Sequence, residues 1–131
     1  MGSFSSYTNT QKILNYIYLN KPAIRPDALF CDGTKDYRIP SEPMVGDEVT
    51  IKFRTARRNV DFVFCICNGE RIAMEVTEWD HAFEYFETKL PPLKNEKIEY
   101  YFEIQLGNSY CYYNKLGVQT EVNPTYNFSI M

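Results

Sequence analysis

Side chains that could carry out catalysis are scattered along this sequence and form no recognisable catalytic group. The single histidine, His81, follows Glu78-Trp79-Asp80 in a polar stretch. A serine or cysteine nucleophile needs a base and a group that orients that base, and a lone histidine in a polar loop is typical of a surface side chain. Paired carboxylates can hydrolyse glycosides, but Glu84, Glu87, Glu99 and Glu103 lie at positions typical of a solvated strand face. The sequence therefore predicts no catalytic residue.

The four cysteines, at positions 31, 65, 67 and 111, are the other reactive side chains. Cys65 and Cys67 are two residues apart in an apolar run, so on a strand both point to one face. Zinc sites use a wider gap and a second matching pair, and no phosphate-binding glycine loop or histidine–glutamate metal motif occurs. We expect four reduced, buried thiols, no metal, no cofactor and a reducing, cytoplasmic compartment.

Aromatic side chains favour binding over catalysis. Trp79 is the only tryptophan and lies in a predicted loop, and Tyr101 falls between Glu99 and Glu103 on the polar side of a predicted strand. Tyr110, Tyr112 and Tyr113 crowd one short strand, so at least one of them must be exposed or lie at an interface. Flat exposed rings can pack against the C–H face of a pyranose. We therefore take Trp79 and Tyr101, then Tyr113, as candidate binding residues.

Composition excludes two classes of partner. The net charge is −3 and the basic residues form no stripe, because Arg54, Arg57 and Arg58 make only a local cluster. A general nucleic-acid binder carries a basic face, so none is expected here. No segment approaches the roughly 20 apolar residues of a membrane helix, and Asn15 interrupts the short apolar stretch at residues 13–19.

The elements that must position these residues are predicted to be strands. Val49, Ile51 and Phe53 alternate with polar residues, which indicates a half-buried strand with those three side chains inward. Residues 60–67 are nearly all apolar, as in a central strand, and Asn68-Gly69 then predicts a tight hairpin. Residues 71–76 continue as one strand with Ile72, Met74 and Val76 inward.

The second half of the chain repeats the pattern at residues 83–90, 97–106, 109–113 and 126–130. Tyr100, Phe102 and Ile104 form the inner side of the cleanest amphipathic strand. Seven or eight short strands with a turn about every ten residues predict an all-β, immunoglobulin-like antiparallel sandwich. The sandwich is expected to span residues 24–131. Residues 1–23 are expected to be a tag remnant (Met1-Gly2-Ser3) and a short helical appendage that Thr10 caps.

Several segments resemble a known module. They are Asp27-Ala28-Leu29-Phe30-Cys31-Asp32-Gly33, residues 46–56, Asn59-Val60-Asp61, Phe83-Glu84-Tyr85-Phe86, residues 98–103, Cys111-Tyr112-Tyr113-Asn114-Lys115-Leu116-Gly117 and Phe128-Ser129-Ile130. Their order and spacing are similar to the amino-terminal immunoglobulin-like domain of bacterial neopullulanases, cyclomaltodextrinases and amylopullulanases. That domain is the family 34 carbohydrate-binding module. The resemblance runs from about residue 24 to the end.

The resemblance implies a non-catalytic module followed, after Met131, by a (β/α)₈ barrel that hydrolyses α-glucosidic bonds. Such a module packs on the barrel, often helps the enzyme to form a homodimer, and can bind α-glucan or maltooligosaccharide. Carried over residue by residue, a sugar-contacting role falls on Trp79, Tyr101 and Tyr113, and also on Lys52. The alternative is an interaction domain with no sugar site. A docking face should be a contiguous apolar patch, whereas a sugar site should have one or two flat rings rimmed by hydrogen-bonding groups.

Overall fold

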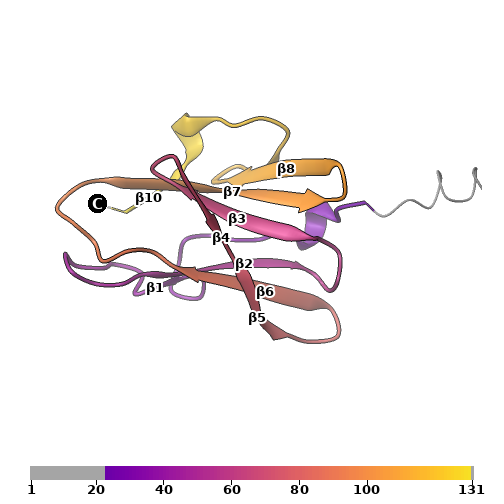
Figure 1. Ribbon diagram of the computed structural model, residues 1–131, viewed down its shortest axis with the longest axis horizontal. Helices are drawn as coiled ribbons and strands as arrows, with labels where there is room; N and C mark the ends of the chain where they lie inside the picture. The colour runs from indigo at the N-terminus through magenta and orange to yellow at the C-terminus, as the bar shows by residue number, and fades with distance from the viewer. Residues whose placement is uncertain (1–22, 131) are drawn as a thin grey trace, which may run out of the picture.

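The computed structural model describes residues 23–130, which form two antiparallel sheets packed face to face (Figure 1). The four-stranded sheet has the order β1 (Arg38–Ile39), β2 (Thr50–Ala56), β6 (Phe83–Lys89) and β5 (Glu75–Trp79). The six-stranded sheet has the order β4 (Glu70–Ala73), β3 (Phe62–Cys67), β7 (Ile98–Leu106), β8 (Ser109–Asn114) and β9 (Gly117–Gln119), and β10 (Phe128–Ile130) also pairs with β7. The predicted all-β sandwich is confirmed. The short strands β1 and β9 were not predicted.

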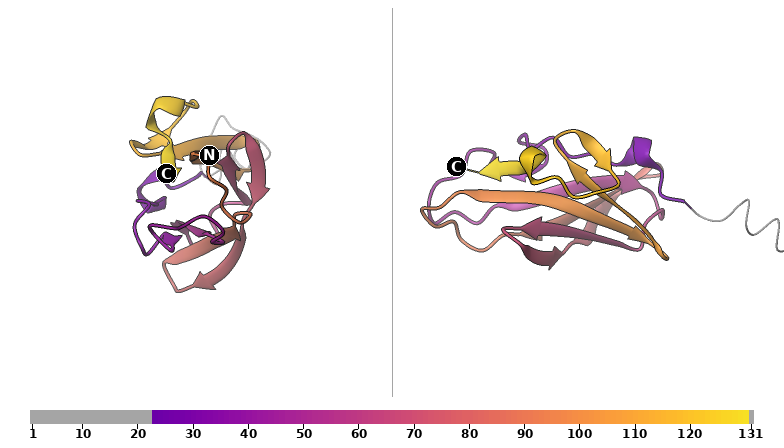
Figure 2. Two further views of the ribbon diagram at one scale, coloured as in Figure 1. Left: turned by 90° about the vertical axis from the view of Figure 1, so that its left-hand side faces the viewer. Right: turned by 90° about the horizontal axis from the view of Figure 1, so that it is seen from above.

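Two short 3-10 helices, η1 (Pro26–Ala28) and η2 (Pro124–Tyr126), complete the described elements. In Figures 1 and 2, η1 and β10 lie at opposite ends of the sandwich. Ile24 already packs against the core. The predicted appendage with its helix after Thr10 lies outside the described residues. No helix in the described part of the chain is long and apolar enough to cross a membrane.

Strand β7 runs through the middle of the six-stranded sheet, with β3 on one edge and both β8 and β10 on the other. Tyr100, Phe102 and Ile104 are fully buried, whereas Tyr101 is only half-buried. Val49, Ile51 and Phe53 are equally buried across the sandwich. The register predicted from alternation is therefore confirmed, because a slip of one residue would have exchanged the two faces.

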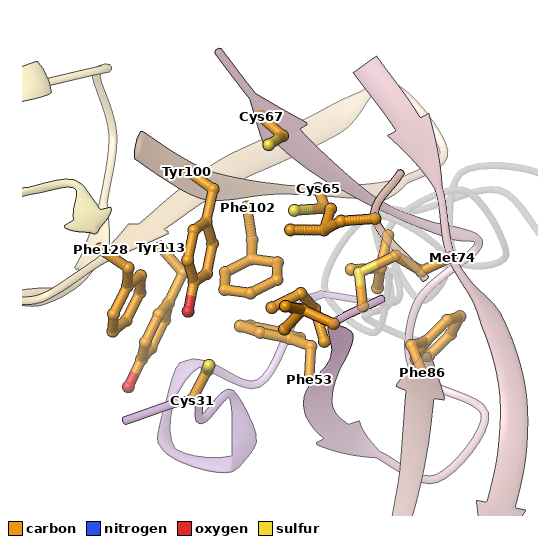
Figure 3. Packing of buried hydrophobic residues seen from close by; sticks show 14 of the residues in the cluster. Cys31, Phe53, Cys65, Cys67, Met74, Phe86, Tyr100, Phe102, Tyr113 and Phe128 are labelled. Carbon is orange, nitrogen blue, oxygen red and sulfur yellow. The ribbon is translucent and has the colours of Figure 1, made fainter. Parts of the chain in front are cut away.

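Aromatic rings from both sheets fill the core (Figure 3). The rings of Phe53 and Phe102 lie 4.6 Å apart between centroids, and those of Tyr100 and Phe128 lie 5.3 Å apart. The hydroxyl of Tyr100 accepts a hydrogen bond of 3.2 Å from Arg38 Nη1, which also donates to the carbonyl of Ser129. Arg38 thus ties β1 to the last strand, and burial raises the pKa of Tyr100.

The expected single strand over residues 71–76 is wrong. The Asn68-Gly69 hairpin forms as predicted, with positive φ angles of 47° and 84°, but β4 ends at Ala73 and the chain then crosses to the other sheet as β5 (Figure 1). Met74 is buried at the crossing, where its N–H donates to the carbonyl of Val63. The change of sheet restarts the alternation, so Val76 is exposed instead of inward.

All four cysteines are free thiols, and three of them are buried. Cys65 and Cys67 share the inner side of β3, as their spacing predicted. Burial raises the pKa of Cys31 to about 12 and that of Cys67 to about 11. Cys111 is only half-buried, so it departs from the expectation of four buried thiols.

Candidate binding surfaces

The structure does not bring the four candidate residues together. Trp79 and Lys52 belong to the four-stranded sheet, Tyr101 lies on the outer face of the six-stranded sheet, and Tyr113 lies between the sheets. The candidates therefore describe two separate surfaces and one core residue.

Tyr113 is not a surface residue, which corrects its selection as an exposed candidate. It keeps 7 % of its surface exposed, and its ring packs edge-on against Phe53 at 5.2 Å. Tyr113 pairs in register with the buried Phe102 of β7, so alternation along β8 directs Tyr110 and Tyr112 outward and Tyr113 inward. Burial raises the pKa of its hydroxyl.

Trp79 is the last residue of β5, not a loop residue, and 61 % of its surface is exposed. The guanidinium carbon of Arg57 lies 5.9 Å from the centroid of the indole ring. Arg57 is held in place by two hydrogen bonds, from its backbone N–H to the carbonyl of Ala82 and from Nη1 to the carbonyl of Asp80. The exposed tryptophan therefore stands next to a fixed hydrogen-bond donor.

Hydrogen bonds to the side chain of Asp80 stabilise the turn between β5 and β6. One carboxylate oxygen accepts the backbone N–H groups of Ala82 and Phe83, both at 2.8 Å. These two bonds lower the pKa of Asp80, because they stabilise its charged form. An aspartate that folds back on its own backbone favours this turn and fixes the positions of Trp79 and His81 on either side of it.

A cavity of about 310 Å³ opens between this turn, η1 and the loop after β2. It is lined by Arg25, Asp27, Ala28, Ala56, Arg57, His81, Ala82 and Phe83, and we call it the loop-end cavity. Among the described residues, no carboxylate forms an ion pair with Arg25 or Arg57. The cavity therefore has two guanidinium groups, neither with a carboxylate partner in the described part of the chain, and one carboxylate, and Arg57 connects it to the exposed indole.

Lys52 forms ion pairs with two glutamates of its own sheet. Its Nζ lies 2.6 Å from a carboxylate oxygen of Glu78 and 3.8 Å from one of Glu87. The hydrogen bond to Glu78 raises the pKa of Lys52, against a smaller lowering by burial. Since Glu78 directly precedes Trp79, the ion pair of Lys52 ties β2 to the strand that carries the tryptophan.

Tyr101 belongs to a larger surface on the outer side of the six-stranded sheet. We call this surface the aromatic face; its members are Phe62, Phe64, Ile66, Tyr101, Tyr110 and Tyr112. Ring centroids are 6.1 Å apart for Tyr101 and Tyr112, and 6.4 Å apart for Tyr110 and Tyr112. Sequence reasoning missed Phe62 and Phe64 because a continuous apolar run predicts burial on both sides. Their register opposite Gln105 and Glu103 is the signal that identifies them as outward.

Charged groups on the aromatic face neutralise one another. The guanidinium carbon of Arg71 lies 3.8 Å from the centroid of the Phe64 ring, and Nη2 of Arg71 forms an ion pair of 2.7 Å with Oε2 of Glu103. Glu103 also accepts a hydrogen bond from the side chain of Gln105. The remaining surface is therefore mainly ring.

The comparison with protein families decides the identity of the fold. The family model described as "Alpha amylase, N-terminal ig-like domain" matches residues 41–130. The chain belongs to this family. The expected immunoglobulin-like domain of the α-amylase superfamily is thereby confirmed.

Two solved structures resemble this α-amylase amino-terminal domain. One is a cyclomaltodextrinase, with a TM-score of 0.67 and 20 % identity, covering 79 % of this chain and 19 % of that one. The other is the type III pullulan hydrolase from Thermococcus kodakarensis, with a TM-score of 0.50 and 14 % identity, covering 77 % of this chain and 16 % of that one. The chain thus spans about a fifth of these proteins or less, and they share its fold. No curated protein sequence matches the domain.

A third surface of this domain lies at the opposite end from the loop-end cavity. Met44 and Val45 are 75 % and 66 % exposed in the loop before β2. Hydrogen bonds from Gly46 N–H to the Leu93 carbonyl and from Leu93 N–H to the Asp47 carbonyl fix this loop. A cavity of about 270 Å³ beside this loop reaches the last strand; it is lined by Pro43, Val45, Leu93 and Ile130 and by the polar residues Lys94, Asn95, Glu96 and Lys97. No pattern in the sequence pointed to this apolar end.

Proposed function

We propose that this domain is a non-catalytic module of an α-glucan-degrading glycoside hydrolase and binds a starch-derived glucan chain beside Trp79. One observation carries the proposal: a largely exposed indole adjoins the loop-end cavity, with Arg57 joining the two. This arrangement has the features expected of a sugar site, a flat ring and a rim of polar groups.

The chemistry of each group suits a sugar ring. The apolar C–H face of a pyranose packs on the indole, while Arg57 and His81 donate to hydroxyl oxygens and Asp27 accepts from a hydroxyl. A shallow site of this kind buries little area, so we expect a dissociation constant of about 10 μM to 1 mM, or roughly −7 to −4 kcal/mol.

The names of the two similar solved structures support the ligand class. Cyclomaltodextrin and pullulan are both built from α-linked glucose, and each is the substrate named for one of those enzymes. The enzyme that contains this domain would then supply the acidic catalytic residues from a (β/α)₈ barrel. Four free thiols suit a reducing compartment, so we place the enzyme in the cytoplasm.

Titration of the domain with maltoheptaose or β-cyclodextrin, followed by amide and indole N–H chemical shifts, tests the proposal. Shifts should be concentrated at Trp79, Arg57 and His81. Trp79→Ala should weaken binding on the order of tenfold, about 1.4 kcal/mol, without lowering the melting temperature. Tyr110→Ala is the matched control, because Tyr110 is 61 % exposed, like Trp79, but lies on the aromatic face. Absence of any shift with millimolar maltoheptaose would rule out the sugar site.

A second candidate function, docking without a sugar site, is favoured by the apolar end at Met44 and Val45. This end adjoins β10, so it is well placed to contact the barrel or, in the complete enzyme, a second subunit. In the complete enzyme, replacing Met44 and Val45 by serine should lower the unfolding temperature. Leu116→Ser, which removes a side chain 58 % exposed elsewhere, should not. Equal effects of the two changes would argue against docking at this end.

A further inference from the structure

The aromatic face lies on the other sheet from Trp79 and has no part in the proposed sugar site. Phe62 and Tyr110 expose 57 % and 61 % of their surface, Phe64, Tyr101 and Tyr112 are half-buried beside them, and Ile66 is buried. Contiguous apolar patches on a soluble domain mark surfaces that something else covers.

The tyrosine rings of the aromatic face do not form a flat platform for a sugar. The Tyr101 and Tyr112 rings are inclined to each other by 67°, and the Tyr110 and Tyr112 rings by 72°. Neighbouring tyrosines therefore meet edge to face. Only the Phe62 and Phe64 rings, 6.0 Å apart between centroids, are nearly parallel, with an angle of 26° between them. A surface of this shape, with its charges already paired, fits branched aliphatic side chains that insert between the rings.

The described part of the chain begins at the end of the sandwich where Phe62 and Tyr110 lie (Figure 1). Asn59 holds the point of exit: its Nδ2 donates to the carbonyl of Ala23, and its Oδ1 accepts the N–H of Arg25. Asn59 precedes Phe62 by three residues, and Phe62 shares a cross-strand row with Gln105 and Tyr110. Figure 1 shows the chain entering the sandwich at the end where β7 turns into β8.

The amino-terminal segment that precedes Ala23 contains apolar residues that could pack on the aromatic face. Ile13, Leu14, Ile17 and Tyr18 fall on one side at helical spacing. Four extended residues, 19–22, span at most about 13–14 Å, which exceeds the roughly 10 Å from β3 across β7 to β8. Residues 19–22 are therefore long enough to carry the apolar segment across the aromatic face from β3 to β8.

The charge of the amino-terminal segment disfavours docking in the loop-end cavity, which also lies near Ala23. Residues 1–22 contain two lysines, Lys12 and Lys21, and no acidic residue. The loop-end cavity is lined by two arginines, Arg25 and Arg57, against one carboxylate, Asp27, so its positive charge disfavours the lysines. The aromatic face, whose Arg71 is neutralised by Glu103, would not.

We propose that the chain's own amino-terminal segment, residues 13–18, docks through Ile13, Leu14 and Ile17 on the aromatic face. The segment itself lies outside the described residues. Docked there, it would cover the rings that the sandwich leaves exposed and would keep that face from binding other proteins.

Chemical shifts of the full-length chain test this proposal. Replacing Ile13, Leu14 and Ile17 together by serine should move the signals of Phe62, Tyr101 and Tyr110 and raise the binding of a hydrophobic dye. The matched control, Gln11→Ser with Asn15→Ser, changes the same segment but keeps its apolar residues. It should neither move the signals of the aromatic face nor raise the binding of the dye.

The reciprocal variant, Phe62→Ser with Tyr110→Ser, should shift the amide signals of residues 13–18. The proposal is overturned if the triple serine variant leaves the aromatic face unchanged. It is also overturned if the signals of that face depend on protein concentration and sedimentation shows a dimer, because a second copy would then be the occupant. Neither result bears on sugar binding, whose signals lie at Trp79.

Discussion

Truncation of Phe102 gives the sharpest test of the packing described above. Phe102 is fully buried on the central strand β7, and its ring meets Phe53 from the opposite sheet at 4.6 Å. Tyr100 and Phe128 complete its surroundings, at 5.8 Å and 6.0 Å between centroids. Removing the ring leaves a cavity bounded by both sheets, which fixed strands cannot close.

We expect Phe102→Ala to lower the free energy of unfolding by about 3–5 kcal/mol, from the lost burial and the cavity together. For a domain of this size the melting temperature should fall by roughly 10–25 °C. Urea denaturation followed by circular dichroism measures the loss, and an unchanged slope against urea shows that the change lies in stability alone.

Tyr101→Ala, at the adjacent residue on the outer face, is the control and should cost about 1 kcal/mol or less. If Phe102→Ala lost less than about 1.5 kcal/mol, or no more than Tyr101→Ala, the assignment of inner and outer faces would be refuted. Should Phe102→Ala fail to fold, Phe102→Leu retains part of the volume and should show a smaller loss with the same sign.

Three further predictions follow from single residues. Alkylation of the native domain without reductant should modify Cys111 first and all four thiols after unfolding, whereas only two modified thiols would reveal a disulfide. Arg38→Met removes the donor to the Tyr100 hydroxyl and should cost about 1–3 kcal/mol in denaturant unfolding, while a neutral result would mean that water replaces it. Lys52→Met should destabilise the domain at neutral pH. Because Glu78 raises the pKa of Lys52 above 10.5, the difference between the two proteins should disappear only as the pH rises beyond that value; a difference unchanged there would show that the charge contributes nothing.

Local patterns predicted most of the strands. Tyr100, Phe102 and Ile104 alternate with polar residues, and that period alone identifies both the strand and its inner side. Asn68-Gly69 predicted the hairpin because both positions take positive φ angles, which asparagine and glycine tolerate. The family resemblance added the assignment to an amino-terminal immunoglobulin-like domain, and the family match over residues 41–130 then confirmed that assignment.

The candidate site was less accessible to sequence reasoning. Trp79 was identified correctly as an exposed ring, but Arg57 and Asp27 approach its surroundings from segments 22 and 52 residues earlier in the chain. Tyr113 was misplaced because three tyrosines within four positions do not reveal which of them faces a partner sheet. The inward direction of Tyr113 depends on its register with Phe102.

The sequence by itself determined that this chain forms strands, where most of them lie, and which side of the most regular ones is apolar. These properties depend on neighbours one or two residues away. Only the tertiary structure decided that β4 and β5 belong to different sheets, that Phe62 and Phe64 face outward, and that Arg57 connects Trp79 to a cavity. Each of those outcomes depends on pairing between distant segments, since a strand acquires an inside and an outside only when another strand or sheet packs against it.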